Sequence, residues 1–274
     1  MATLRIQRIG SFEAPELRPY ATMKRPLEHE QQGLFVAEGT KVARRLIESR
    51  FTVVSAVLPD KWLAEFAPLL AARPEKEIPV YLADKPLLEQ LVGFSMFQGV
   101  MAVGRIPAPE SLDSILVRSR PPRLFVALDA LTNAENLGTL VRNCVAFHAQ
   151  ALIVGETCGS PFLRRSVRSS MGTIFQLPVA DVRNLAQSLR ELRRLGVRCV
   201  AAHPHAEGRT LARADLTRDC CLVFGSEGHG LRAEVLAACD EAVAIPMPSE
   251  VDSINVGAAA AVFLYEANRQ RGKM

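Results

Sequence analysis

The sequence predicts an α/β protein with two domains, and three observations support this. Short apolar runs alternate with helix-periodic segments along the chain. In the second half these runs are continuously apolar, as in parallel strands that are covered on both faces. The segment 105–123 between the halves is rich in proline, serine and charge, which is typical of a linker. We therefore expect an N-terminal domain at 1–106, a linker at 107–122 and a C-terminal domain at 123–274.

Hydrophobic periodicity predicts the elements in chain order. In the N-terminal domain it indicates strands at 33–39, 52–59, 78–83 and 99–106, with helices at 40–49, 61–72 and 85–92. In the C-terminal domain it indicates strands at 123–131, 151–156, 176–181, 197–203, 220–225 and 241–247. Helices are expected from 137, around 164–171, at 182–196, between 225 and 241, and from 256.

Composition restricts the class of protein. The chain has 274 residues, of which 49% are hydrophobic and 23% charged, as expected for a globular protein. Its net charge of +4 is compatible with a nucleic-acid partner. The N-terminus carries no secretory signal pattern, and the longest apolar run is too short to span a bilayer, so we expect a cytoplasmic protein that is not bound to a membrane.

Cysteines and histidines give no metal-site pattern. The six cysteines form no C-x-x-C pair, and several lie in apolar runs, so we expect reduced thiols in the core. His203 and His205 lack further ligands at suitable spacing, which favours a turn at a strand end. The chain also lacks G-x-G-x-x-G after the first strand of the second domain, and G-x-x-x-x-G-K-[ST] anywhere, which argues against NAD and nucleoside triphosphates as ligands.

Three polar segments interrupt the apolar second half, and the first is "NAENLGTLVRN" at 133–143. Asn136 stands where a helix is expected to begin, so it is either an N-cap or a functional amide. Arg142 lies further along the same helix. It is either a solvated surface charge or a contact for a phosphate or sugar.

The other two polar segments follow late strands. "GSEGHG" at 225–230 places glycines after a buried strand, where the backbone can turn sharply and present N–H groups to a ligand. Glu227 in this segment is either a carboxylate that interacts favourably with the dipole of the next helix or a functional residue of the site. Ser253 and Asn255 stand at the start of an alanine-rich helix, either as caps or as site residues, and the small side chains leave room for another backbone or a ligand.

Taken together, the three segments resemble a known family. The order "N-x-x-N-x-G-x-x-x-R", "F-G-S-E-G-H-G-L", "I-P-M-x-x-x-V-D-S-I-N-V" resembles the signature motifs of the SpoU (TrmH-like) RNA ribose 2′-O-methyltransferases of the SPOUT superfamily. "RRSVRSSMGTIFQLPV" at 164–179 is similar to the family's intervening segment. "LFVAEGTKVARRLIES" and "FQGVMAV" in the first domain look like the RNA substrate-binding domain that many members carry.

This resemblance implies a fold and an activity. The C-terminal domain would be a parallel-sheet SPOUT methyltransferase domain with a trefoil knot, preceded by a smaller α/β RNA-binding domain. The protein would be a homodimer through its C-terminal domain. It would bind S-adenosyl-L-methionine, need no metal, and methylate a ribose 2′-hydroxyl of structured RNA, with ribosomal RNA favoured over transfer RNA.

The resemblance also implies site residues. The implied catalytic residues are Arg142, Asn136, Glu227, Ser253 and Asn255. The implied cofactor-binding residues are Gly225, Ser226, Ile245, Met247, Ile254 and Asn255. The implied RNA-binding residues are Arg142, Arg164, Arg165 and Arg168, although the last three could equally form a solvated basic face.

Two departures and two alternatives accompany this interpretation. Family members often carry proline where this chain has Ala134, and a second serine where it has Gly257. The alternatives are a non-catalytic RNA-binding protein of ribosome assembly on the same fold, and a methyltransferase that acts on a base nitrogen of RNA. Retention of Arg142, Ser253 and Asn255 favours an active enzyme, and the "SINV" motif with the Asn136/Arg142 pair favours ribose.

Overall fold

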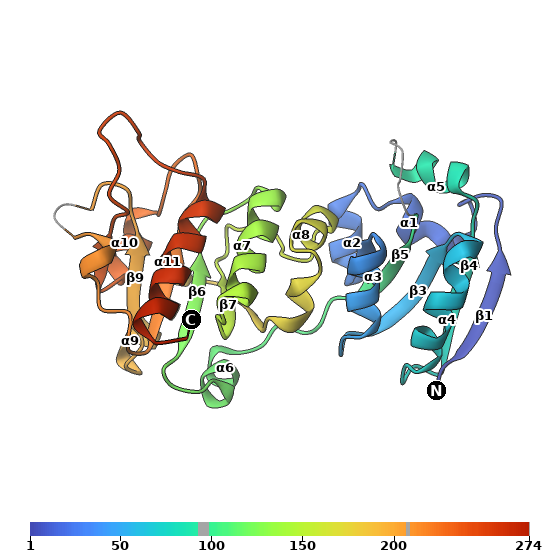
Figure 1. Ribbon diagram of the computed structural model, residues 1–274, viewed down its shortest axis with the longest axis horizontal. Coiled ribbons are helices and arrows are strands. Elements are labelled where there is room, and N and C mark those ends of the chain that lie inside the picture. Colours follow the sequence, from blue (N-terminus) through green and yellow to red (C-terminus); the bar gives the residue numbers. More distant parts are fainter. Residues whose placement is uncertain (93–98, 207–208, 274) are drawn as a thin grey trace. The chain divides into compact units, whose positions relative to one another are not determined.

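The computed structural model describes residues 1–92, 99–206 and 209–273, and the chain forms two compact units (Figure 1). The first unit comprises Met1–Ala108 and Phe162–Phe175, and the second comprises Pro109–Pro161 and Gln176–Met274. The first two residues of the "FQGVMAV" motif lie outside the described residues. None of the helices in the described part has the length and apolar character needed to cross a membrane.

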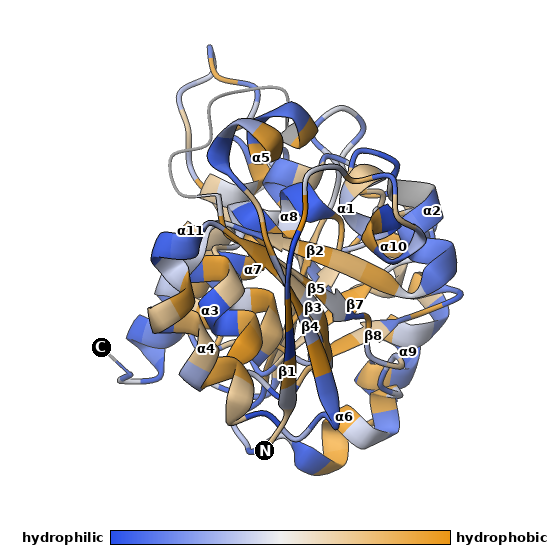
Figure 2. Cartoon of the chain, turned by 90° about the vertical axis from the view of Figure 1, so that its right-hand side faces the viewer, coloured by the Kyte–Doolittle hydropathy of each residue, from blue (hydrophilic) through white to orange (hydrophobic). Residues whose placement is uncertain are grey.

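The first unit is built on a mixed five-stranded sheet in the order β1-β4-β3-β5-β2. Strand β5 runs antiparallel to both β2 and β3, whereas the β1–β4 and β3–β4 pairs are parallel. The strands are β1 (Thr3–Arg8), β2 (Leu34–Glu38), β3 (Val53–Leu58), β4 (Glu77–Leu82) and β5 (Met101–Arg105). The helices are α1 (Arg18–Ala21), α2 (Pro26–Gln32), α3 (Thr40–Ile47), α4 (Leu63–Ala71) and α5 (Lys85–Val92). Buried β2 is coloured as hydrophobic over most of its length in Figure 2.

Helix α8 (Arg164–Ser169) belongs to the first unit by its contacts, although it follows a strand of the second. It packs against β2. Phe162 and Phe175, at the two ends of the segment, pack against Phe35 and Phe51 with ring centroids 5.5–5.9 Å apart. Aromatic burial of this kind is a strong packing term, which accounts for the attachment of the segment to β2.

The second unit contains a six-stranded sheet in the order β11-β9-β10-β6-β7-β8, and every pair in it is parallel. The strands are β6 (Leu124–Leu128), β7 (Ala151–Val154), β8 (Val179–Asp181), β9 (Arg198–Ala202), β10 (Cys220–Phe224) and β11 (Glu241–Val243). Every residue of β6, β7 and β10 is buried. This confirms the prediction that continuous apolar runs form a parallel sheet covered on both faces.

Helices cover both faces of this sheet. The helices are α6 (Leu112–Arg118), α7 (Ala134–Ala146), α9 (Leu185–Arg194), α10 (Ala233–Ala238) and α11 (Val256–Gln270). Helices α6, α9 and α10 contribute Ile115, Leu189 and Val235 to one apolar core with the strands. Helix α11 packs against α7 and β10. Phe263 of α11 meets Phe224 of β10 edge-on at 5.6 Å between ring centroids.

Two local expectations need correction. The segment 107–122 contains helix α6, which Ser111 caps by accepting a hydrogen bond from the Ser114 N–H at 3.2 Å. Burial of Ile115 in the core explains why this polar stretch is helical. Helix α7 begins at Ala134 rather than at 137, because Asn133 is its N-cap. As predicted, the six cysteines are free thiols.

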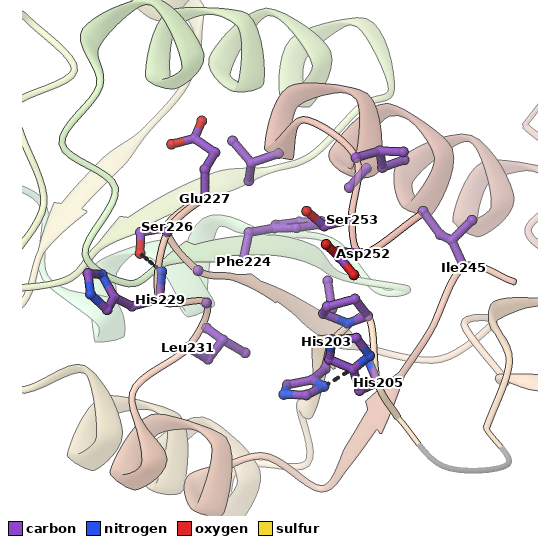
Figure 3. A pocket seen from close by; sticks show the side chains of 18 of the residues that line it. His203, His205, Phe224, Ser226, Glu227, His229, Leu231, Ile245, Asp252 and Ser253 are labelled. Atoms are coloured by element: carbon purple, nitrogen blue, oxygen red, sulfur yellow. Dashed lines mark hydrogen bonds between the residues drawn. The ribbon is translucent and has the colours of Figure 1, made fainter. Parts of the chain in front are cut away.

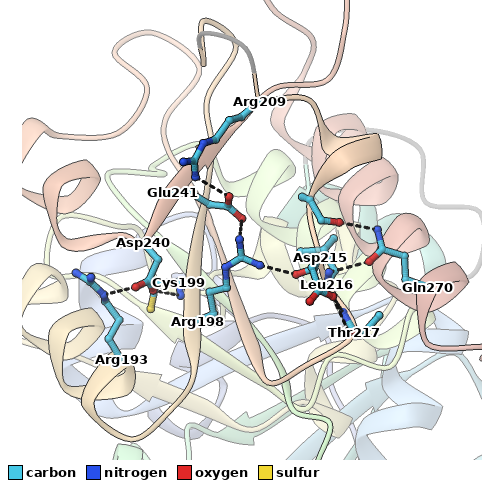
Figure 4. A network of polar contacts seen from close by, with 11 residues as sticks. Arg193, Arg198, Cys199, Arg209, Asp215, Leu216, Thr217, Asp240, Glu241 and Gln270 are labelled. Atoms are coloured by element: carbon cyan, nitrogen blue, oxygen red, sulfur yellow. Dashed lines mark hydrogen bonds and ion pairs between the residues drawn. The ribbon is translucent and has the colours of Figure 1, made fainter.

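Polar contacts connect β9, β11 and the end of α11 (Figure 4). Arg198 bridges Glu241 at 2.5 Å and the Asp215 carbonyl at 2.8 Å. Gln270 accepts a hydrogen bond from the Leu216 N–H at 2.7 Å and donates to the Ala214 carbonyl at 2.9 Å. The segment that precedes β10 is thereby held between β9 and the C-terminal end of α11.

Candidate active site

A glycine-rich loop leaves the carboxyl end of β10 at Gly225. The Ser226 N–H donates to the Gly230 carbonyl at 3.1 Å and the Gly230 N–H returns a bond to Ser226 at 2.9 Å, which closes the loop. A Cβ atom on Gly225 would lie 2.2 Å from the carbonyl carbon of Gly230, and Gly230 itself has φ +67°. Both positions therefore require glycine.

The loop forms one wall of a pocket of about 370 Å³ (Figure 3). The pocket lies at the carboxyl ends of β9, β10 and β11, where parallel α/β sheets bind their ligands. Of the predicted cofactor-binding residues, Gly225, Ser226, Ile245, Met247 and Ile254 line it. Asn255 is not among the lining residues, and its side chain is engaged elsewhere.

Three of the five predicted catalytic residues, Glu227, Asn136 and Asn255, form one chain of hydrogen bonds. The Asn136 amide donates to the Glu227 carboxylate. Asn255 donates its amide N–H to the Asn136 Oδ1 at 3.0 Å. Residues from the glycine loop, the first turn of α7 and the start of α11 therefore meet, although the sequence separates Asn136 from Asn255 by 119 positions.

The capping alternatives are now assigned. Asn133 Oδ1 accepts the N–H groups of Glu135 and Asn136 at 3.0 and 3.1 Å, so Asn136 is not the cap of α7 and its side chain is available to Glu227. Asn255 is the N-cap of α11, because its Oδ1 accepts the Gly257 N–H at 2.9 Å. The Asn255 side chain therefore has two roles. Its oxygen caps α11, and its nitrogen donates to Asn136 in the chain of hydrogen bonds.

The remaining predicted catalytic residues lie differently. Ser253 lines the pocket. Arg142 is exposed on α7 beyond Asn136, and its side chain forms no hydrogen bond or ion pair with another described residue. The structure thus leaves its guanidinium open to a ligand and does not bring it into the Glu227–Asn136–Asn255 chain. Arg142 thus presents an exposed, positively charged side chain on α7.

The three predicted RNA-binding arginines of α8 differ from one another. Arg164 and Arg168 both form ion pairs with the buried carboxylate of Glu38, the latter at 2.9 Å. Arg164 is only 12% exposed, so it is largely committed to Glu38. Arg165 is exposed, and across residues 1–92, 99–206 and 209–273 it has no ion-pair partner.

Residues to which the sequence pattern gave no site role also line the pocket. His203 and His205 form the predicted turn at a strand end, in which the His205 N–H donates to the His203 Nδ1 at 3.2 Å, and this turn lies in the pocket wall. Asp252 and Phe263 line it as well. Strand order would have indicated this role for the two histidines. Strand β9 is the hydrogen-bonded parallel neighbour of β10, so the residues that follow β9 must lie beside Gly225.

An ion-pair network anchors the end of the glycine-rich loop to the segments that follow β6 and β7. Arg232, two residues after Gly230, donates from Nε to the fully buried Asp129 at 2.7 Å and from Nη2 to Glu156 at 2.6 Å. Asp129 and Glu156 follow β6 and β7, so Arg232 connects the end of the loop to two central strands. Burial raises the pKa of Glu156, but hydrogen bonds from its own backbone, Arg232 and the Leu185 N–H outweigh this and hold that pKa below its usual value.

The site fits the requirements of S-adenosyl-L-methionine. Its apolar lining includes Ile245, Leu231 and Phe263, which suit an aromatic base, while Glu227 and Asp252 supply carboxylates that favour a cation. The Gly225 loop brings bare backbone to the pocket. Within the described part of the chain, no cluster of three or more His, Cys, Asp and Glu side chains could hold a metal ion.

Comparison with known proteins agrees with this geometry. Residues 123–265 match the SpoU rRNA Methylase family. The chain is 34% identical over 242 residues to an uncharacterized tRNA/rRNA methyltransferase of Mycobacterium tuberculosis, covering 87% of this chain and 82% of that protein. It is 34% identical to the 23S rRNA (guanosine-2′-O-)-methyltransferase RlmB of Ralstonia nicotianae, covering 77% of this chain and 84% of that protein.

A solved structure extends the likeness to the whole fold. The SpoU methyltransferase AviRb of Streptomyces viridochromogenes, in complex with the cofactor AdoMet, superposes with a TM-score of 0.82 at 26% identity, covering 94% of this chain and 98% of that chain. The fold and family expected from the three motifs are therefore confirmed. This chain belongs to the SpoU rRNA methylase family.

Proposed function

We propose that this enzyme transfers a methyl group from S-adenosyl-L-methionine to a ribose 2′-hydroxyl of structured RNA, with ribosomal RNA favoured over transfer RNA. The observation that carries the proposal is the Glu227–Asn136–Asn255 chain of hydrogen bonds beside the pocket at Gly225. The RlmB relative, named for guanosine 2′-O-methylation of 23S rRNA, supports the ribose and the ribosomal RNA.

The pocket residues would hold the cofactor. Gly225 and Ser226 offer backbone at the loop, while Ile245, Met247 and Ile254 supply apolar walls. When bound, S-adenosyl-L-methionine supplies an electrophilic methyl group on a sulfonium. Because the Ser226–Gly230 bonds fix the loop before any ligand arrives, binding would not require ordering of this backbone.

The chain's own polar residues would align and activate the 2′-hydroxyl. Glu227 and Asn255 hold the Asn136 amide from both sides, which fixes the first turn of α7. That helix carries Arg142, whose free guanidinium would bind a substrate phosphate and stabilise negative charge that develops on the 2′-oxygen. A guanidinium that stays protonated is a poor general base, so the proton would leave to the bound phosphate or to water. Ser253 would contact the substrate from the pocket wall.

Two further properties belong to the proposal. Helix α11 exposes Val262 and Tyr265, which are 41% and 48% exposed, and we propose that this face joins a second copy of the chain as a homodimer. We also propose the trefoil knot that the family resemblance implies, and the end of α11 contacts the segments at 214–218 and 122–123, because Arg271 donates to the carbonyls of Leu216 and Arg123 at 2.7 and 3.0 Å. The cytoplasmic location stays a prediction from the sequence, as do the domain bounds 1–106 and 123–274.

The proposal is tested with tritiated S-adenosyl-L-methionine and unmodified 23S rRNA or bulk tRNA. We expect label in rRNA, and a loss of about 100- to 1,000-fold in kcat for Arg142→Ala with unchanged cofactor affinity, as when one transition-state donor is removed. Arg190→Ala, an exposed arginine of α9, is the matched control. Cofactor binding without transfer to either RNA would contradict the proposal and favour the non-catalytic RNA-binding alternative.

A further inference from the structure

The second unit has an open depression at the edge of its sheet opposite the cofactor pocket. The depression is lined by Arg118, Arg120, His148, Gln150, Gln176 and Lys273, among others. Arg120, Gln150 and Gln176 precede β6, β7 and β8, so they lie at the amino ends of these strands. Because the sheet is entirely parallel, the pocket and the depression lie at opposite strand ends, which are about 15 Å apart along a five-residue strand, and they also lie at different strands of the sheet.

The depression has a one-sided charge. Its described lining includes Arg118, Arg120 and Lys273 and contains no carboxylate. Arg118 is paired with Glu110 at 2.5 Å. Within the described residues neither the Arg120 guanidinium nor the Lys273 ammonium forms an ion pair, and both side chains are exposed. Two cations are therefore available to an external anion.

Hydrogen bonds fix the backbone that carries Arg120. The Gln150 side chain accepts the Arg120 N–H and donates to the Arg120 carbonyl, both at 2.9 Å. The same Gln150 amide reaches the Pro122 carbonyl at 3.3 Å. The polar groups of the Gln150 side chain thus hold the backbone at 120–122, and the Arg120 side chain extends from this fixed backbone.

Lys273 and His148 are positioned by the ends of two helices. The Lys273 N–H donates to the Asn268 carbonyl at 3.0 Å, and Asn268 donates its own amide to the Phe147 carbonyl at 2.6 Å. His148 has φ 58°, in the left-handed position after a helix that glycine usually occupies. This backbone conformation is uncommon for a residue with a side chain, and it places His148 in the lining of the depression.

We propose that this basic depression binds the phosphate backbone of the RNA substrate at a point remote from the methylated nucleotide. Phosphates fit because the lining is an open surface with separated cations and the exposed Gln176 side chain, and not an enclosed apolar cavity. Since the depression lies at the amino ends of the strands and the pocket at their carboxyl ends, only an RNA long enough to reach both ends of the sheet would contact both. The inference rests on the proposed function for the identity of the partner.

The test is filter binding of unmodified 23S rRNA across a series of salt concentrations. We compare the wild type, Arg120→Gln/Lys273→Gln, and the charge-matched control Arg190→Gln/Arg194→Gln on α9, whose exposed arginines do not line the depression. Loss of two phosphate contacts should lower the salt slope of log affinity by about 2 and weaken binding on the order of tenfold near physiological salt. The control should retain the wild-type slope.

An unchanged slope in Arg120→Gln/Lys273→Gln, or an equal loss in the control, would overturn the inference. A thermal melt separates a folding defect from a binding defect, and the single variant Arg120→Lys should keep the wild-type slope because it keeps the positive charge. Failure of the proposed function looks different. In that case the wild type transfers no methyl group to RNA, while the salt slopes still decide whether the depression binds phosphates.

Discussion

Gly257 stands at the position where the family resemblance leads us to expect a serine, and the structure predicts the effect of introducing one. A Cβ atom on Gly257 would lie 2.9 Å from Thr139 Cγ2 and 3.1 Å from Asn255 Oδ1. Carbon atoms pack best at about 3.5–4.0 Å, so Thr139 would have to move. It is restrained, because its hydroxyl donates to the Glu135 carbonyl at 2.9 Å.

The two energetic contributions have opposite signs. Overpacking costs about 1–3 kcal/mol, whereas replacing glycine in a helix returns about 0.5 kcal/mol. We therefore expect Gly257→Ser to destabilise the start of α11 by about 1–2 kcal/mol, a factor of roughly 5–30 in local opening. Thr139→Ser removes the clashing methyl and keeps the hydroxyl bond. In that background the cost of Gly257→Ser should fall below about 0.5 kcal/mol, a coupling expected of contacting residues.

Amide hydrogen exchange of α7 and α11 peptides is the appropriate assay. The only tryptophan, Trp62, lies in the first unit, so its fluorescence does not report on this contact. Four proteins are compared: the wild type, both single variants and the double variant. If Gly257→Ser costs the same with threonine or serine at position 139, the packing explanation is wrong.

Three more outcomes follow from the site. Gly225→Ala should lower affinity for S-adenosyl-L-methionine by at least about tenfold in titration calorimetry, because its Cβ would meet the Gly230 backbone at 2.2 Å, whereas Gly228→Ala, with nothing within 4 Å, should bind normally. Arg232→Met should reduce the free energy of unfolding by about 3–5 kcal/mol in urea, because the buried Asp129 carboxylate keeps the backbone N–H of residue 232 but loses its ion-pair partner, and adding Asp129→Asn should recover part of the loss. Glu156 has a lowered pKa in the folded protein, so its contribution is present above its ordinary value of 4.5 and is lost as the pH falls through the folded value; the difference in Tm between the wild type and Glu156→Gln should shrink accordingly on acidification.

The sequence predicted the second unit better than the first for a physical reason. Continuous apolar runs such as 220–225 identify strands that are covered on both faces, and the carboxyl ends of such strands converge. The strand pattern did not assign Gly225, Ile245 and Ile254 to one pocket; the family resemblance implied them as cofactor-binding residues, and all three line the pocket at these strand ends. Strand β1 escaped prediction because it lies at a sheet edge and most of its residues are exposed, so its pattern carries no apolar face.

Contacts distant in sequence could not be predicted from local patterns. Asn136 was a possible cap by its position in the sequence, and only the fold brings its amide between Glu227 and Asn255. Arg164 resembled a free phosphate ligand, but a buried carboxylate 126 positions away at Glu38 occupies it. His203 was correctly placed in a turn, and its role in the pocket wall depends on strand order, which periodicity does not encode. Ala134 is the first residue of α7, where the proline that is common in the family would also fit.

The position of the transferred methyl group tests the central claim most directly. RNA cleavage by alkali requires a free 2′-hydroxyl, so a methylated ribose blocks it. We predict that 23S rRNA labelled by the wild-type enzyme and tritiated S-adenosyl-L-methionine will yield its label in alkali-resistant dinucleotides after complete hydrolysis, and that Arg142→Ala will yield almost none. Label in mononucleotides would place the methyl group on a base and contradict the assignment of the ribose 2′-oxygen.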